Sequence, residues 1–140
     1  MALNIYLNFD GDCAAAFDFY KSVFGGDFTV HSTFAEAPPD IKFDPTEGGR
    51  IMHVSLPVGG AVLMGSDVAR GFGEPHAAGN NFSISYSPDT REEADRAFGA
   101  LSDGGAVVMA MDNTFWGSYF GLCKDKFGIQ WMVNVDLGEK

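Results

Sequence analysis

Two stretches decide how this chain folds: Thr114-Phe115-Trp116-Gly117-Ser118-Tyr119-Phe120-Gly121 and Asp125-Lys126-Phe127-Gly128-Ile129-Gln130-Trp131-Met132. Phe127-Gly128 separates two alternating runs rich in aromatic and β-branched residues, so the stretches predict the last hairpin of a sheet. They also contain both tryptophans of the protein. Large rings around a strand turn either fill a core or line a pocket, and the sequence alone favours the core.

The same order of elements is predicted twice along the chain. Residues 3–9 alternate as a strand, and a helix capped by Asp12 follows and ends at Gly25-Gly26. Residues 81–87 alternate in the same way, and a helix that begins at Asp89 or Thr90 ends at Gly104-Gly105. Further strands are predicted at 27–35, 51–56 and 61–66, and again at 106–111, 117–123 and 129–135. An internal duplication of a βαβββ unit is the simplest interpretation.

This pattern predicts an α+β fold in which two tandem βαβββ modules form a curved mixed sheet, a half-barrel, around a cavity. We expect a single domain over residues 1–140, with module 1 at about 1–67, a linker at about 68–80 and module 2 at about 81–140. The segment 36–50 is either a lid or a surface loop without a role. The apolar strand positions expected under the helices are Ile5, Leu7, Phe9, Phe82, Ile84 and Tyr86.

Composition and charge exclude several classes of function. The chain has 140 residues, of which 46% are hydrophobic and 14% aromatic, so it is long enough for a folded core and is not disordered. Its net charge of −10 repels phosphate backbones, and the lysines and arginines are scattered, so we expect no nucleic-acid partner. No signal peptide or membrane span is visible, which predicts a cytoplasmic protein without a membrane partner. Cys13 and Cys123 are expected to be free thiols.

Several motifs resemble a known family. They are Tyr6-Leu7-Asn8-Phe9-Asp10-Gly11, Phe19-Tyr20-Lys21-Ser22-Val23-Phe24-Gly25, Ile51-Met52-His53-Val54 and the two stretches quoted above. Together they resemble the PhnB-like (demethylubiquinone methyltransferase-like) branch of the glyoxalase/bleomycin resistance/dioxygenase superfamily, the vicinal oxygen chelate proteins. The resemblance covers nearly the whole chain, and it implies paired βαβββ modules and a homodimer.

The resemblance also implies where a metal would bind. Metal-dependent members of the superfamily hold a divalent ion with His and Glu from the first and last strands of each module. Here the first strands offer Tyr6 or Asn8 and Ser83 or Ser85. Aligning Gly60 with Gly128 places Met64 and Met132 where Glu is expected. A thioether is a poor ligand for such metals, so we predict no metal and no other cofactor, with a divalent metal as the disfavoured alternative.

The candidate site combines one histidine with the polar faces of the strands. His53, on a predicted strand beside Ser55, is our candidate catalytic base, although a histidine that only bonds the neighbouring strand is the commoner case. The carboxylates Glu36, Asp44 and Glu47 are expected to be solvated. No serine has an apparent histidine and acid at triad spacing. The predicted ligand-binding cavity is lined by Tyr6, Asn8, Met64, Ser83, Ser85, Trp116, Tyr119, Gln130 and Met132, whereas Trp131 should face the helix.

These observations leave the activity unassigned, and they do not decide whether the protein is an enzyme. The favoured hypothesis is a PhnB-like protein that binds a small organic molecule in a metal-free cavity. One alternative is a metal-dependent glyoxalase-like lyase, isomerase or dioxygenase that uses His53, and another is a drug-sequestering resistance protein. A methyltransferase has less support, because no Gly-rich loop follows a strand to hold an adenosyl cofactor.

Overall fold

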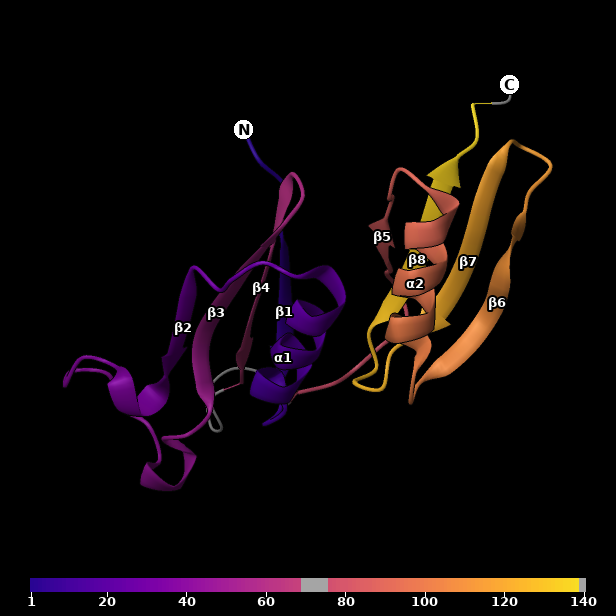
Figure 1. The fold of residues 1–140 in the computed structure, drawn as a ribbon. Helices are drawn as coiled ribbons and strands as arrows, with labels where there is room; N and C mark the ends of the chain where they lie inside the picture. The colour runs from indigo at the N-terminus through magenta and orange to yellow at the C-terminus, as the bar shows by residue number, and fades with distance from the viewer. Residues whose placement is uncertain (69–75, 139–140) are drawn as a thin grey trace. The chain divides into compact units, whose positions relative to one another are not determined.

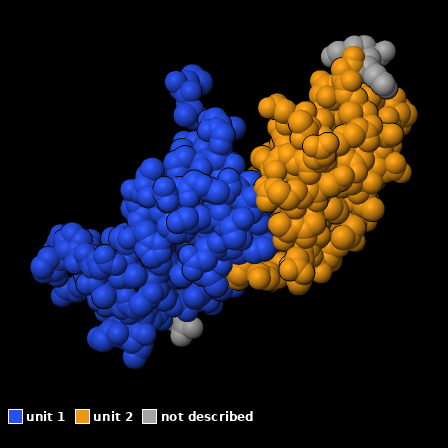
Figure 2. Space-filling view, in the orientation of Figure 1, with its two compact units in different colours: residues 1–77 blue, residues 78–140 orange. Residues whose placement is uncertain are grey.

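The computed structural model describes residues 1–68 and 76–138. The chain divides into two compact units, Met1–Ala77 (unit 1) and Ala78–Lys140 (unit 2), which are coloured separately in Figure 2. Among the described residues, each unit has one α-helix and one four-stranded mixed sheet, so the predicted α+β fold of two βαβββ modules is confirmed. No helix in the described part of the chain is long and apolar enough to cross a membrane.

Unit 1 is a sheet with a single long helix on one face (Figure 1). The strands lie in the order β1-β4-β3-β2, with β1 parallel to β4 and the other pairs antiparallel. Two short 3-10 helices, η1 and η2, lie in the segment between β2 and β3. The elements are β1 Ile5–Phe9, α1 Cys13–Phe24, β2 Val30–Thr33, η1 Phe34–Glu36, η2 Pro45–Glu47, β3 Ile51–Val58 and β4 Ala61–Asp67.

The core of unit 1 lies between α1 and the sheet. Phe17 of α1 is 1% exposed and packs so closely on Gly65 of β4 that a Cβ built on the glycine would lie 2.6 Å from the ring. Leu7 and Phe9 of β1 are buried on the same side, as the alternation predicted, whereas Ile5 is only half-buried. Glycine at position 65 therefore sets how closely the helix approaches the sheet.

Unit 2 repeats the arrangement, with α2 on one face of a sheet in the order β5-β8-β7-β6 (Figure 1). β5 is parallel to β8, and the other pairs are antiparallel. Trp131 is 2% exposed on the α2 side, which confirms its predicted orientation. Gly121 packs against Phe98 of α2 as Gly65 does against Phe17. The elements are β5 Ile84–Tyr86, α2 Arg91–Ser102, β6 Ala106–Asn113, β7 Ser118–Lys124 and β8 Gln130–Asp136.

The edge strand β6 is irregular and carries exposed apolar side chains. Val107, Val108 and Met109 are 54%, 65% and 51% exposed. The pairing of β6 with β7 shifts twice, between Val107 and Met109 and again between Met109 and Asp112. Each shift adds an extra residue on β6, which is the mark of a β-bulge.

Two local predictions were wrong. Asp12 occupies the N-cap position of α1, but its side chain makes no capping hydrogen bond, and the carboxylate of Asp67 accepts the N–H groups of Gly11 and Cys13 instead. The strand predicted at 81–87 is only three residues long. Phe82 therefore lies outside β5 and is 53% exposed rather than packed under a helix, because the ladder with β8 begins only at Ile84.

Candidate functional site

The sheet of unit 1 has one face that α1 does not cover. The strand register aligns Tyr6 with Met64, Met64 with Ser55, and Ser55 with Val30, so these four side chains form a row across all four strands. Side chains alternate along a strand, and the neighbouring Leu7 packs toward α1. The row therefore lies on the opposite, open face of unit 1.

His53 of β3 is the centre of the polar contacts on this open face. The hydroxyl of Tyr6 lies 3.4 Å from Nδ1, and the two rings stack with their centroids 5.7 Å apart at an angle of 25°. The Oγ atom of Ser55 lies 3.5 Å from Nε2. Both distances exceed the optimum of about 2.9 Å, so the hydroxyls flank the ring without holding it tightly. Ser32 of β2 donates to the backbone carbonyl of His53 at 3.4 Å.

The two hydroxyls beside His53 differ in their access to solvent. Tyr6 is 45% exposed, whereas Ser55 is 6% exposed. Among the described residues, no carboxylate hydrogen-bonds the His53 ring. Within residues 1–68 and 76–138, the side-chain hydrogen-bond contacts of the imidazole are with these two neutral hydroxyls, and the Tyr6 side is the more exposed of the two.

The open face of unit 2 repeats the row without a histidine. The register aligns Ser85 with Met132, Met132 with Leu122, and Leu122 with Met109. Met132 thus lies in the last strand of unit 2 and pairs with the parallel first strand, as Met64 does in unit 1. Both serines are exposed, but only Ser85 lies in β5 and pairs with β8, whereas Ser83 precedes the strand.

The residues at the implied metal positions do not fit a divalent ion that chelates oxygen ligands. The pairs at these positions are Tyr6 with Met64 and Ser85 with Met132. Each pair supplies a neutral hydroxyl and a thioether, whereas such ions are held by carboxylates and imidazoles. Within residues 1–68 and 76–138, no three His, Cys, Asp or Glu side chains form a group that could hold a metal. We therefore assign no step of chemistry to a metal.

Trp116 and Tyr119 lie on different sides of the sheet of unit 2. Trp116, in the β6–β7 turn, is 55% exposed and packs edge-on against Phe120, which pairs with Asn134 on the open face. Tyr119 instead donates its hydroxyl to Asp95 of α2 at 2.6 Å, and this hydrogen bond raises the pKa of the phenol. Of the two rings, the structure therefore brings only Trp116 to the open face.

Two further predicted cavity residues lie at the ends of the strands. Asn8 is exposed on β1, two residues beyond Tyr6 and on the same face. Gln130 begins β8 and donates its side-chain amide to the carbonyl of Phe82 at 2.5 Å. Gln130 thus fastens the segment before β5 to β8, which is a structural role.

The Asp-x-Phe-Gly-x-Gln-Trp motif builds the β7–β8 turn. Asp125 is 3% exposed, and its Oδ1 accepts the N–H groups of Phe127 at 2.8 Å and Ile129 at 3.0 Å. Its Oδ2 accepts the indole N–H of Trp131 at 2.9 Å. The turn requires glycine at position 128, where φ is +92°. The Asp125, Gly128 and Trp131 positions of this motif therefore fix a hairpin and its packing.

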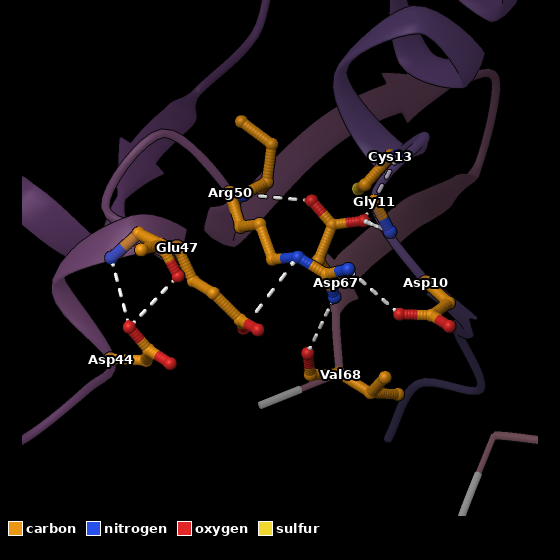
Figure 3. A network of polar contacts seen from close by, with 10 residues as sticks. Asp10, Gly11, Cys13, Asp44, Glu47, Arg50, Asp67 and Val68 are labelled. Atoms are coloured by element: carbon orange, nitrogen blue, oxygen red, sulfur yellow. Dashed lines mark hydrogen bonds and ion pairs between the residues drawn. The ribbon is translucent and has the colours of Figure 1, made fainter. Parts of the chain in front are cut away.

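A polar network centred on the buried Asp67, which the sequence did not reveal, joins the segment before α1 to β3 and β4 (Figure 3). Asp67 accepts three backbone N–H groups, from Gly11 at 2.7 Å, Cys13 at 3.1 Å and Ile51 at 2.9 Å. Arg50 pairs with Asp10 at 2.8 Å and donates to the carbonyl of Val68 at 3.0 Å. The hydrogen bond to Asp10 raises the pKa of the Arg50 guanidinium further above its ordinary value. The carboxylate of Asp67 thus accepts the N–H of Cys13, the first residue of α1, and places a negative charge at this helix N-terminus.

The segment 36–50 is tied to this network and to itself. Glu47 was expected to be solvated, but it is 8% exposed and lies 3.6 Å from Nε of Arg50. Asp44 caps η2 by accepting from Thr46, and Glu36 accepts the N–H and hydroxyl of Thr33. All three carboxylates therefore have partners within their own part of unit 1.

Neither cysteine is a candidate nucleophile. Cys13 and Cys123 are free and buried. Burial, reinforced by Asp67, raises the pKa of the Cys13 thiol, and burial raises the pKa of Cys123 to about 11. Both therefore remain neutral thiols near pH 7.

Comparison with known proteins identifies the family. The model of the 3-demethylubiquinone-9 3-methyltransferase family matches residues 2–134. The chain belongs to this family. It is thus a PhnB-like member of the glyoxalase/bleomycin resistance/dioxygenase superfamily, and the resemblance seen in the sequence is confirmed.

Relatives of this family match along nearly their whole length. Protein YjdN of Escherichia coli is 32% identical over 96% of this chain and 95% of its own. The crystal structure of protein PA1353 from Pseudomonas aeruginosa is 37% identical, with a TM-score of 0.86 over 96% of this chain and 98% of that one. A glyoxalase/bleomycin resistance protein/dioxygenase family enzyme from Burkholderia phytofirmans shares only the fold, at 20% identity and a TM-score of 0.63 over 94% and 97% of the two chains.

The description of the family names a methyltransferase, but the residues here do not fit a Rossmann-type adenosyl site. Such a site needs a doubly wound parallel sheet with a glycine-rich turn leading into a helix N-terminus. In the part of the chain that the structure describes, each sheet has a single parallel pair of strands. The N-terminus of α1 is filled by Asp67, whose negative charge would repel a phosphate or a carboxylate. We therefore derive no methyl transfer from these residues.

The sequence pointed to His53 and to Ser55 beside it on the strand, but it did not pair His53 with Tyr6. The spacing of two residues on one strand places the side chains of His53 and Ser55 on the same face. The stacking of Tyr6 across β4 depends on the strand order, which the sequence does not contain.

Proposed function

We propose that this protein binds a small organic molecule on the open face of unit 1, at the cluster formed by Tyr6, His53, Ser55 and Met64. One observation carries the proposal: both ring nitrogens of His53 face hydroxyl groups, at 3.4 and 3.5 Å, on a sheet face that α1 leaves uncovered. A half-exposed aromatic ring and a thioether beside neutral hydrogen-bonding groups suit a partly aromatic, partly polar molecule.

We extend the proposal to the open face of unit 2, where Ser85, Met132 and Trp116 supply a hydroxyl, a thioether and an indole. The protein would act without a bound metal, because neither row offers a carboxylate. We further propose that it is cytoplasmic and functions as a homodimer, in keeping with its neutral buried thiols and its family. These features are those of a binding protein, and catalysis is a separate question.

A binding screen with matched variants tests the proposal. Aromatic and polar organic compounds are tested for an increase in melting temperature, and binding is then measured by equilibrium dialysis. We expect Tyr6→Ala to lower the affinity for the best-binding compound at least tenfold. Asp18→Ala, a substitution at an exposed position of α1, should leave that affinity unchanged. Equal binding to wild type and Tyr6→Ala would place the ligand elsewhere and overturn the proposal.

Metal content separates this proposal from a metal-dependent enzyme. Untagged protein purified without chelators is analysed for metal per chain, alongside His53→Ala. We expect substoichiometric metal that the substitution does not change. Near-stoichiometric metal that disappears in His53→Ala would instead support a glyoxalase-like lyase, isomerase or dioxygenase.

A further inference from the structure

We infer that His53 accepts a proton from the bound ligand through Nδ1, and that the ligand is a weak acid whose O–H is carried on an aromatic or enolic carbon. The inference rests on the proposed function and goes beyond it, because it names the chemical class of the ligand and the atom that receives the proton. It follows from the contacts of His53, from the exposure of its neighbours and from the charges that face it.

The contacts of His53 select Nδ1 as the acceptor. Neutral imidazole donates from one nitrogen and accepts at the other. Nε2 points to the buried Oγ of Ser55, which can accept its proton, while Nδ1 faces the half-exposed hydroxyl of Tyr6. We assign the proton to Nε2 on these contacts. This tautomer presents the lone pair of Nδ1 on the side that a ligand can reach.

The loose contact between Tyr6 and His53 leaves a place for a ligand oxygen. At 3.4 Å the phenol and Nδ1 are too far apart for a strong hydrogen bond, so a ligand O–H can replace it with shorter ones. The ligand O–H bond breaks and an N–H bond forms at Nδ1, without any change in oxidation state. The ligand oxygen, now an anion, accepts from the new Nδ1–H and from the hydroxyl of Tyr6.

The charges around His53 decide the class of ligand. The open face presents Tyr6 from β1, Met64 and Ser66 from β4, Ser55 from β3, and Val30 and Ser32 from β2. Tyr6 is the only titratable group among these neighbours, and none is a cation. A permanent anion such as a carboxylate or phosphate would find no counter-ion, and the chain already carries a net charge of −10. The ligand therefore arrives neutral and becomes ionised only at His53.

Proton transfer fits this site better than attack by Ser55. Nucleophilic acyl transfer needs free N–H donors to stabilise an oxyanion. Ser55 lies inside the β2–β3–β4 ladder, paired with Val30 and Met64, and is 6% exposed. Its hydroxyl can orient His53 but is poorly placed to receive a substrate carbonyl.

The test uses 4-nitrophenol, whose anion is coloured, and 4-nitroanisole, which has the same ring without the acidic proton. Equilibrium dialysis measures the binding of both, and absorbance across pH measures the ionised fraction of bound nitrophenol. We expect bound nitrophenol to ionise at least one pH unit lower than free nitrophenol, a tenfold change in the ionisation ratio. His53→Gln should abolish this shift. Tyr6→Phe, which keeps the aromatic ring but lacks the hydroxyl, should reduce the ionisation shift.

A second readout does not depend on a variant. Ring signals of His53 in wild-type protein, followed by nuclear magnetic resonance at fixed pH, should move to imidazolium positions with nitrophenol and not with nitroanisole. His31 and His76 serve as internal controls and should not move. This measurement decides the case even if His53→Gln fails to fold.

The outcomes distinguish the inference from the proposed function. Binding of both probes without an ionisation shift, or with the same shift in His53→Gln, would overturn the inference and leave the binding site in place. Failure of both probes to bind would overturn the inference and count against the proposed function as well. Binding with a shift that requires His53 supports both.

Discussion

Replacing Asp125 by alanine removes an acceptor that three donors share. The carboxylate is 3% exposed and accepts two backbone N–H groups of its own turn together with the indole N–H of Trp131. Trp131 is itself 2% exposed, so its indole N–H has no access to water once the carboxylate is gone. The two turn N–H groups belong to half-buried residues and can turn to solvent.

These contacts set the size of the expected effect. An orphaned buried donor costs about 1–3 kcal/mol, and each replaced hydrogen bond at the turn costs about 0.5–1.5 kcal/mol. We therefore expect Asp125→Ala to lower the free energy of unfolding by about 2–6 kcal/mol. For a domain of ordinary stability, about 5–15 kcal/mol, this is a large fraction of the total.

Urea unfolding followed by tryptophan fluorescence measures the effect, because both tryptophans lie in unit 2 with Asp125. Asp112→Ala is the matched control, since this exposed carboxylate accepts only one N–H group. A double-mutant cycle with Trp131→Phe isolates the indole contact, and we expect a coupling energy of about 1–3 kcal/mol. A loss below about 1 kcal/mol, or no coupling, would refute the structural role assigned to the motif.

Three further changes test the packing and electrostatics of the units. Gly65→Ala would place a Cβ 2.6 Å from Phe17 and should destabilise by about 1–3 kcal/mol in chemical denaturation, whereas Gly60→Ala, with no atom within 4 Å, should not. Gly99→Ala, in the exposed middle of α2 with nothing within 4 Å, should stabilise by about 1 kcal/mol, and a lower melting temperature would contradict this. Burial, aided by a bond to Glu93, raises the pKa of Tyr86 from 10.0 to about 12. Between about pH 10 and pH 12 the phenol therefore stays protonated in the folded state but loses its proton in the unfolded state. The free energy of unfolding should fall as the pH rises through this range. For Tyr86→Phe, the free energy of unfolding should depend less on pH in the same range.

The order of elements could be predicted because it depends on local periodicity. Alternation predicted the strands, and glycine pairs predicted the ends of both helices. The alignment of Met64 with Met132 needed only a count from the hairpin glycines. In the structure each methionine lies in the last strand of its unit and pairs with the parallel first strand. Trp131 was assigned to the helix side by parity alone. Each of these inferences uses residues close together in the sequence.

The polar contacts could not be predicted in the same way, because they join distant residues. Asp67 bonds Gly11 across 56 positions, and this pairing exists only when β4 lies beside β1. The stacking of Tyr6 on His53 likewise requires the strand order. Phe82 was assigned to the core by alternation, but the extent of β5 depends on where β8 begins. The candidate site could therefore be named residue by residue, although its connections required the fold.

The irregular edge of unit 2 bears on the solubility of the chain. A flat edge strand with apolar side chains is a template on which other chains can add strands and grow into aggregates. β6 carries Val107, Val108 and Met109 at such an edge, without a charge among them. Its two bulges break the even spacing of N–H and C=O groups that an incoming strand would have to match. The bulges therefore disfavour the addition of a further strand along this hydrophobic border.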